Sequence, residues 1–241
     1  LLNMDVSNTE WIDLEPKSEY FFFVPKSVDV ENKYSAGLPL SEVFHVQQGG
    51  LSTDRDELFF DFDYELLKNR IETFYSEAGM NPEFRKAYRG KDSSSYNLLS
   101  RRTKTSFDPC NIYQCIYRPF DLRWLYYNPG LTSRPIFEVM RHMLASENLG
   151  LIFMRQVVLQ DIYSHIGVTK GLVNNRAFYS NKGRVSLAPL YLYPTPAKNS
   201  SRQKSLSSAD WPPGKDGRIP NLSPEFIADF AEKLVLEFVP D

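Results

Sequence analysis

Runs of aromatic and β-branched residues along the chain predict short strands. The run 20–24 stops at a proline, which is typical of a buried strand. The run 112–127 is dense in aromatic residues, and Pro119 divides it, so two consecutive strands are expected there. Further strands are predicted over 149–155, 165–169 and 187–193.

Apolar residues at helical spacing predict short helices between these strands. The helical period over 63–75 predicts one helix, and 81–88 predicts a second. Thr132 or Ser133 is expected to cap a third helix that begins near Pro135 and ends at 148–150. The sequence Ser-Pro-Glu from Ser223 supplies a cap, a first-turn proline and a first-turn acid, so it predicts a fourth helix.

Stretches without periodicity predict loops. The segment 91–106 is polar and rich in Ser and Arg, and 198–217 is rich in Ser, Lys and Pro, so both are expected to be loops. The pair Gly49–Gly50 predicts a tight turn or a close approach of two backbones. Because strands and helices alternate irregularly, the predicted fold class is α+β, with mixed, largely antiparallel twisted sheets and flanking helices.

Charge is strongly segregated along the 241 residues, although the net charge is only −2. Residues 1–84 hold 6 Lys and Arg against 17 Asp and Glu, a net of −11. Residues 85–204 hold 19 against 6, a net of +13, and residues 205–241 hold 3 against 7, a net of −4. A basic block of this size is typical of a surface that binds a polyanion. Charge blocks that fold back and neutralise one another are the competing interpretation.

The remaining bulk features narrow the class of protein. No apolar run approaches the roughly 18 residues of a membrane span, so no membrane partner is expected. Cys110 and Cys115 are too few for a zinc site or a disulfide framework, which favours reduced thiols and a cytoplasmic location. Leu1 stands where an initiator Met is expected, which predicts a piece of a longer chain.

Several segments in order resemble the C-terminal specificity region of type ISP restriction–modification enzymes. The matching segments are WIDLEPKSEYFFFVPK, LSEVF with GGLSTDRD, YRPFDLRWLYY, EVMRHML with ENLGLIFMRQ, SHIGVT, LAPLYLYP and IPNLSPEF. The Gly-x-x-Thr-x-Arg-Asp part of GGLSTDRD also resembles the loop that opens the specificity domain of related adenine methyltransferases. In that family a Gly commonly follows the Thr, whereas Asp54 follows Thr53 here. The family pattern continues beyond Asp241, which again predicts a fragment.

The resemblance implies a division of labour within a longer enzyme. This chain would recognise double-stranded DNA and position an upstream adenine-specific methyltransferase and a helicase and nuclease of the same parent chain. S-adenosylmethionine, ATP and Mg²⁺ would belong to those upstream parts, and no cofactor or metal is expected in this chain. The sequence carries no complete catalytic motif. An adenine methyltransferase of this class needs an Asn-Pro-Pro-aromatic motif, whose polar groups hold the amine of a flipped base, and Asn128-Pro129-Gly130 lacks its second Pro and its aromatic residue. No phosphate-binding loop for ATP is present in the sequence.

The chain is accordingly divided by composition into four parts. Residues 1–84 form the acidic part, 85–197 the basic DNA-reading core, 198–220 a mobile loop and 221–241 the start of a helical part, all expected to belong to one composite domain.

Candidate DNA contacts follow from the chemistry of readout. Arg can bond guanine through two donors, and Asn or Gln matches adenine, while basic and hydroxyl side chains hold phosphates. Arg155 and Gln156 place both chemistries after a predicted strand. The candidates are Thr53, Arg55, Arg101, Arg102, Lys104, Arg123, Arg134, Arg155, Gln156, Ser164, His165, Thr169, Arg176, Lys182 and Arg184.

Structural roles compete with several of these assignments. Arg155 and Gln156 could bond neighbouring backbone, and Arg55 could pair with an adjacent carboxylate. Arg118 and Asp121 favour an internal ion pair or a hydrogen-bond bracket over DNA contact. The aromatic residues of 124–127 favour core packing over base stacking.

Three other functions remain open from the sequence. An RNA-binding module would share the basic block. A stand-alone enzyme could use Asp61 and Asp63 as paired carboxylates on one face of a strand. A protein–protein adaptor could dock an acidic partner on the basic block.

Overall fold

The computed structural model describes residues 7, 10–14, 28–156, 165–178, 183–194 and 217–235. The chain divides into two compact units, 1–42 and 43–241. The predicted strand over 20–24 and all but the last residue of the predicted loop over 198–217 lie outside the described residues. Among the described helices, none is long and apolar enough to cross a membrane.

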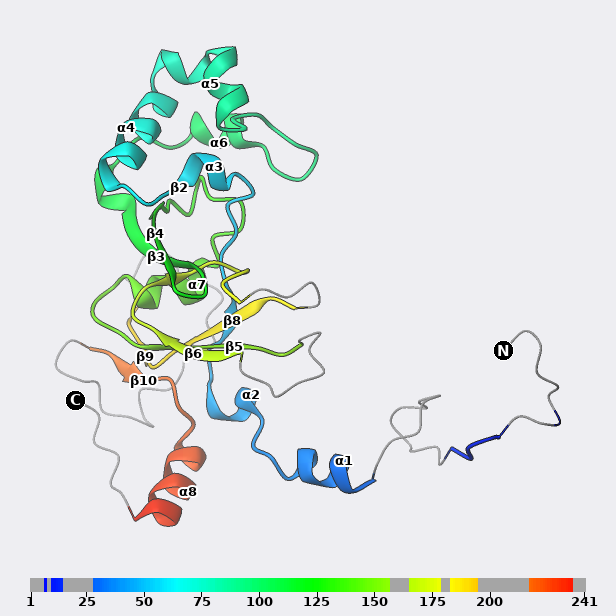
Figure 1. Ribbon diagram of the computed structural model, residues 1–241. Helices are drawn as coiled ribbons and strands as arrows, with labels where there is room; N and C mark the ends of the chain where they lie inside the picture. The colour runs from blue at the N-terminus through cyan, green and yellow to red at the C-terminus, as the bar shows by residue number, and fades with distance from the viewer. Residues whose placement is uncertain are drawn as a thin grey trace. The chain divides into compact units, whose positions relative to one another are not determined.

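Helices and strands both contribute to the fold, so the predicted α+β class is confirmed (Figure 1). The α-helices are α1 (Val28–Ser35), α2 (Leu40–Val43), α3 (Asp56–Phe59), α4 (Tyr64–Tyr75), α5 (Pro82–Ala87), α6 (Leu98–Arg102), α7 (Phe137–Met140) and α8 (Pro224–Leu234). Short 3-10 turns are η2 (Glu77–Met80), η3 (Pro109–Asn111) and η4 (Arg141–Met143). The strands are β1 (Gln48–Gly49), β2 (Phe60–Asp61), β3 (Ile112–Arg118), β4 (Asp121–Tyr126), β5 (Gly150–Met154), β6 (Ile166–Thr169), β7 (Leu172–Val173), β8 (Val185–Pro189), β9 (Tyr191–Leu192) and β10 (Ile219–Pro220).

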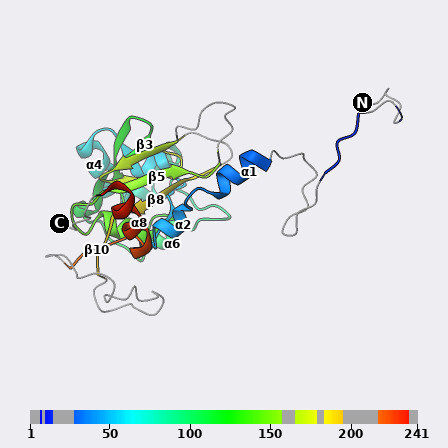
Figure 2. The same cartoon turned by 90° about the horizontal axis from the view of Figure 1, so that it is seen from below.

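Two four-stranded sheets form the centre of unit 43–241. One has the order β1-β8-β5-β6 and is antiparallel throughout, and β5 and β8 run side by side in Figure 2. The other has the order β2-β4-β3-β7, in which β3 pairs with β7 in parallel and the remaining pairs are antiparallel. Strands from before residue 84 therefore pair with strands from after it in both sheets.

The helices α3 to α6 gather at one end of this unit, with β3 and β4 between them and the β1-β8-β5-β6 sheet (Figure 1). We call residues 55–104, which contain α3 to α6, the helical end. Leu67, Ile71 and Phe74 of α4 are buried in the common core, whereas Leu66 is 59% exposed. Asp63 accepts a hydrogen bond from the Leu66 amide and caps α4, so the predicted helix over 63–75 is confirmed.

The two sheets meet where the chain passes from one to the other. After β1, Leu51 forms a bridge with Asn174, and Ser52 forms one with Arg134. A Cβ on Gly50 would lie 2.7 Å from the amide nitrogen of Asn175, so this glycine permits the close backbone approach that was predicted. We call residues 48–52, 134, 174–176 and 184–185 the sheet junction.

Two predicted elements differ in extent from the structure. The helix expected from Pro135 is shorter, because the Arg134 backbone pairs with Ser52 and Ile136 adopts a left-handed conformation before α7 begins. The predicted capping residue Ser133 instead donates a hydrogen bond to Asp54. The run 187–193 is not one strand: it divides into β8 and β9, because the Leu190 amide bonds Leu149 and β9 pairs with β10.

The polar segment 91–106 is not simply a surface loop. It contains α6, and it buries Tyr96 and Leu98. The Tyr96 hydroxyl donates to the Leu131 carbonyl over 2.6 Å. Two apolar anchors therefore fix this segment despite its polar composition.

Candidate nucleic-acid interface

Arginines from distant parts of the basic block line one cleft at the sheet junction. The cleft, called here the arginine cleft, is lined by Ser52, Asp54, Asp56, Glu57, Phe60, Arg89, Tyr117, Arg118, Arg123, Arg134, Asn174, Asn175, Arg176 and Arg184. Its six arginines against three carboxylates give a net charge of +3. All six arginines come from 85–204, whereas the three carboxylates come from the acidic opening part.

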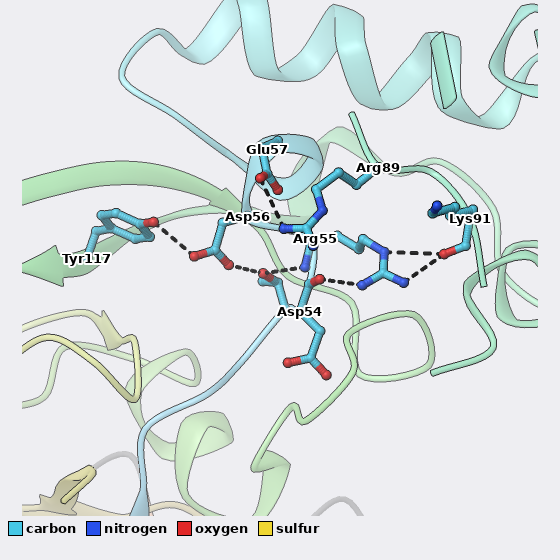
Figure 3. A network of polar contacts seen from close by, with 8 residues as sticks. Asp54, Arg55, Asp56, Glu57, Arg89, Lys91 and Tyr117 are labelled. Atoms are coloured by element: carbon cyan, nitrogen blue, oxygen red, sulfur yellow. Dashed lines mark hydrogen bonds and ion pairs between the residues drawn. The ribbon is translucent and has the colours of Figure 1, made fainter. Parts of the chain in front are cut away.

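Two carboxylates of the cleft, Asp54 and Asp56, accept hydrogen bonds from neutral hydroxyl groups, and Figure 3 shows the contact of Asp56 with Tyr117. Asp56 accepts from the Thr53 hydroxyl and, over 2.9 Å, from the Tyr117 hydroxyl. Asp54 accepts from the hydroxyls of Ser52 and Ser133. Within the described part of the chain, Asp54 and Asp56 therefore form no ion pair with the arginines of the cleft.

The hydroxyl contacts of Asp54 favour its ionised form. Burial opposes ionisation of Asp54, but the hydroxyls of Ser133 and Ser52 and the nearby arginines Arg134 and Arg55 together hold its pKa below the ordinary value. The pKa of Tyr117 is raised by burial and by Asp56, so the phenol stays protonated and donates.

Within the described residues, two of the six arginines form ion pairs with acids. Arg89 contacts Glu57 at 3.3 Å, and Arg123 contacts Asp121 at 2.8 Å, which raises the pKa of Arg123. Arg134 and Arg184 are exposed, and neither forms an ion pair with an acid in the described part of the chain. These two side chains can therefore meet an external anion without giving up an internal partner.

A β-bulge directs Arg118 into the cleft. Ile116 lies opposite Leu122 and Arg118 opposite Asp121, so Tyr117 is an extra residue in β3. Because strict alternation would send neighbouring side chains to opposite faces, the bulge explains why Tyr117 and Arg118 line the same cleft. The guanidinium of Arg118 lies 3.9 Å from the centre of the Tyr117 ring and donates to Asn174.

The ion pair predicted between Arg118 and Asp121 is wrong. Although the two residues are opposite each other, Asp121 is bonded by both the Nε and the Nη2 of Arg123. The fork of Arg123 reaches Asp121 two residues away, while the bulge turns Arg118 toward Asn174.

A second, adjoining groove extends the positive surface. It is lined by Gly49, Arg155, Gln156, Arg176, Gly183, Arg184 and Ser186, and we call it the strand-end groove. It shares Arg176 and Arg184 with the arginine cleft, so the two form one continuous surface. Arg155 and Gln156 follow β5 and are exposed, as expected of residues that leave a buried strand.

The structure thus brings part of the predicted set of contacts together. The predicted residues that line the cleft or the groove are Arg123, Arg134, Arg155, Gln156, Arg176 and Arg184. Ser164 and Lys182 lie outside the described residues. Sequence reasoning did not select Arg89, Asn174 or Asn175, and the short strand β7, which the two asparagines follow, was not predicted from the sequence.

Four other predicted residues are engaged inside the fold. The Arg55 side chain is buried, and its guanidinium donates to the carbonyls of Asp54 and Lys91 (Figure 3). The Thr53 hydroxyl donates to Asp56, so the side chains of Thr53 and Arg55 are both engaged by the fold itself. Arg101 donates to the Thr132 carbonyl, and Arg102 donates to the carbonyls of Phe74, Tyr75 and Ser76 at the end of α4. We assign structural roles to these four.

The remaining predicted residues lie elsewhere. Thr169 is buried and forms a turn with Gly171. His165 is half-buried with its ring edge-on to Phe178. Lys104 is exposed at the helical end, so a phosphate contact there stays a prediction.

The carboxylate pair considered for a stand-alone enzyme is also engaged. Asp61 forms an ion pair with Arg70 and accepts from the Asp63 amide, and Asp63 caps α4. The two acids do not alternate along one strand, because β2 ends at Asp61. Within the described ranges, no three His, Cys, Asp or Glu side chains are grouped as a metal site requires.

Comparison with known proteins assigns the family. The sequence pattern of the Type ISP C-terminal specificity domain matches residues 42–240. The chain belongs to this family. No curated protein matches it in sequence.

Solved structures share the fold of this specificity domain at low identity. A cryo-electron microscopy structure of a DrdV–DNA complex matches 97% of the chain with a TM-score of 0.58 and 14% identity. The ATP-dependent Type ISP restriction-modification enzyme LlaBIII bound to DNA matches 78% of the chain with a TM-score of 0.54 and 18% identity. A nuclease-deletion mutant of the Type ISP restriction-modification enzyme LlaGI in complex with a DNA substrate mimic matches 94% of the chain with a TM-score of 0.56 and 16% identity. The specificity domain spans 23%, 12% and 18% of these chains, so it is less than a quarter of their length.

Proposed function

We propose that the arginine cleft and the strand-end groove bind double-stranded DNA, as the target-recognition surface of a type ISP restriction–modification enzyme. The observation that carries the proposal is the gathering of arginines from residues 89 to 184 on one continuous surface of a domain in the specificity family. The structural relatives were solved with DNA, which supports the same assignment.

The surface combines the two tasks that sequence recognition requires. Exposed arginines such as Arg134 and Arg184 supply charge for phosphates, which fixes register on the duplex. Arg155 and Gln156 supply the paired chemistries for guanine and adenine edges in the major groove. Reading and positioning are therefore both available within one surface.

Catalysis is assigned to other parts of the longer enzyme. The chain has no Asn-Pro-Pro-aromatic motif. The two acids considered for a stand-alone enzyme, Asp61 and Asp63, are engaged by Arg70 and by the Leu66 amide. S-adenosylmethionine, ATP and Mg²⁺ accordingly belong to the methyltransferase and motor parts of the parent, and this domain positions the methyltransferase on its adenine. A cytoplasmic location follows from that role.

The decisive experiment compares nucleic acids and salt concentrations. The 241-residue chain is expected to bind duplex DNA more tightly than single-stranded RNA of equal length, with the log of the affinity falling by about three or more units per unit of log salt. Equal or tighter binding to RNA would overturn the DNA assignment. Binding of an acidic protein that persists at high salt, with none to DNA, would favour the adaptor alternative.

Arg155 tests the reading of sequence separately from the holding of phosphates. Arg155→Ala is expected to weaken binding to the preferred site and to relax discrimination at one base pair by about 1–3 kcal/mol, because a two-donor contact to guanine is lost. The measurement is competition between duplexes that differ at single positions. An equal loss on every duplex would place Arg155 on a phosphate instead.

A further inference from the structure

Two neighbouring asparagines after β7 are used in opposite ways. Asn174 is buried, and its side-chain oxygen accepts from the Arg118 guanidinium and, over 2.9 Å, from the Arg176 amide. Asn175 is half-buried and lines the arginine cleft, yet its side-chain amide makes no hydrogen bond within the part of the chain that is described. One amide therefore holds the loop, and the other faces the cleft with a donor and acceptor to offer.

The backbone of Asn175 is fixed from two sides. Its amide donates to the Leu51 carbonyl over 2.8 Å, and its carbonyl accepts from the Val185 amide over 3.1 Å. Gly50 lies so close that no side chain fits between the two segments. A side chain on such a support loses little further freedom when it binds, which favours affinity and specificity.

The surroundings of Asn175 are cationic. Arg176 follows it in the chain, and Arg184 lies beside it through the pairing of Val185 with Asn175. Phosphates next to this position are therefore met by arginines. A neutral amide adds nothing to that charge, but its adjacent donor and acceptor match N7 and N6 of adenine in the major groove.

We propose that Asn175 reads one adenine of the recognised DNA sequence, an inference that rests on the proposed function. Asn174 positions it by fixing Arg118 and the turn to Arg176, and it does not itself contact DNA. Asn174 uses its side-chain oxygen in hydrogen bonds that hold the fold, whereas the side-chain amide of Asn175 is available to read a base.

Selection from duplexes with a randomised central segment tests this assignment. The wild-type chain is expected to enrich one sequence that includes an adenine. Asn175→Ala should lower the preference for that adenine by about tenfold while leaving the other positions unchanged. Asn175→Asp should move the preference at the same position from adenine toward cytosine, because a carboxylate accepts from the cytosine amine and cannot donate to adenine N7.

Asn69→Ala is the matched control, since Asn69 is exposed on α4 at the helical end. It should leave the enriched sequence unchanged, and all three variants should unfold at the wild-type urea concentration. Unchanged base preferences in both Asn175 variants would overturn the assignment of Asn175 but not the proposed function. A uniform loss on all sequences would also overturn it, because Asn175 would then hold the backbone. A wild-type chain that enriches no sequence would overturn the proposed function itself.

Discussion

Three arginines of the helical end and two of the sheet junction have opposite roles. Arg55, Arg101 and Arg102 spend their donors on backbone carbonyls of their own fold. Arg134 and Arg184 are exposed and line a cleft whose carboxylates Asp54 and Asp56 accept hydrogen bonds from hydroxyl groups. Equal positive charge in the sequence therefore stabilises the protein in one region and is available to a ligand in the other.

The largest expected effect separates the two regions through stability. Arg102→Ala removes donors to three carbonyls at the end of α4 and should lower the free energy of unfolding by about 2–3 kcal/mol. Urea denaturation measures this loss. Arg102→Lys should recover little of it, because an ammonium cannot reproduce the planar fork. Wild-type stability in both variants would erase the distinction between the regions.

The sheet junction should respond in the reverse manner. The double variant Arg134→Ala, Arg184→Ala should lose roughly 30-fold in DNA affinity at 0.15 M salt and about two units of log–log salt slope, because two phosphate contacts are lost. Its urea midpoint should match the wild type. A salt slope that stays at the wild-type value would remove both residues from the DNA surface.

Acid should destabilise the protein through His142, which lies outside both the helical end and the sheet junction. Burial and, secondarily, Arg141 lower the pKa of His142 to about 3, and its Nδ1 accepts from the Tyr193 amide. Because the folded pKa lies below the unfolded value, this stabilisation is complete above about pH 6.5 and is lost as the pH falls toward 3. Between pH 6.5 and 5 the loss is about 2 kcal/mol.

His142→Asn identifies the source of that loss. The variant should be less stable at pH 7 but should show a shallower fall between pH 6.5 and 5, measured by urea denaturation at each pH. An unchanged pH dependence would assign the acid sensitivity to other groups.

Lys104 is expected to give the smallest effect. It is exposed at the helical end, so Lys104→Ala should reduce the salt slope by at most about one unit and affect all sequences equally. A slope that does not move would confine the DNA surface to the sheet junction.

Sequence patterns predicted elements well where local chemistry decides the structure. The cap and proline at Ser223 and Pro224 begin α8, and Pro119 separates β3 from β4, as expected. Patterns failed where a distant segment intervenes: the pairing of Arg134 with Ser52 delays α7, and the burial of Tyr96 orders a polar segment.

The candidate site was predictable as a block of charge but not as a set of residues. The block 85–204 contains both Arg102, which caps a helix, and Arg184, which lines the cleft. The sequence does not contain the difference between them, because it depends on which carbonyls lie within reach after folding. Asn175 escaped notice for the same reason, since its availability is defined by what Asn174 already does.

The extra residue at Tyr117 offers a route by which target preference could diversify. Deleting it would restore strict alternation and leave Arg118 opposite Asp121 on the cleft side, while removing the Tyr117 ring that lies against Arg118 and the hydroxyl that binds Asp56. A gain or loss of a single codon would thus change the surroundings of a cleft cation without redesigning the scaffold. Length changes in this hairpin are therefore as promising as point substitutions when new target preferences are engineered.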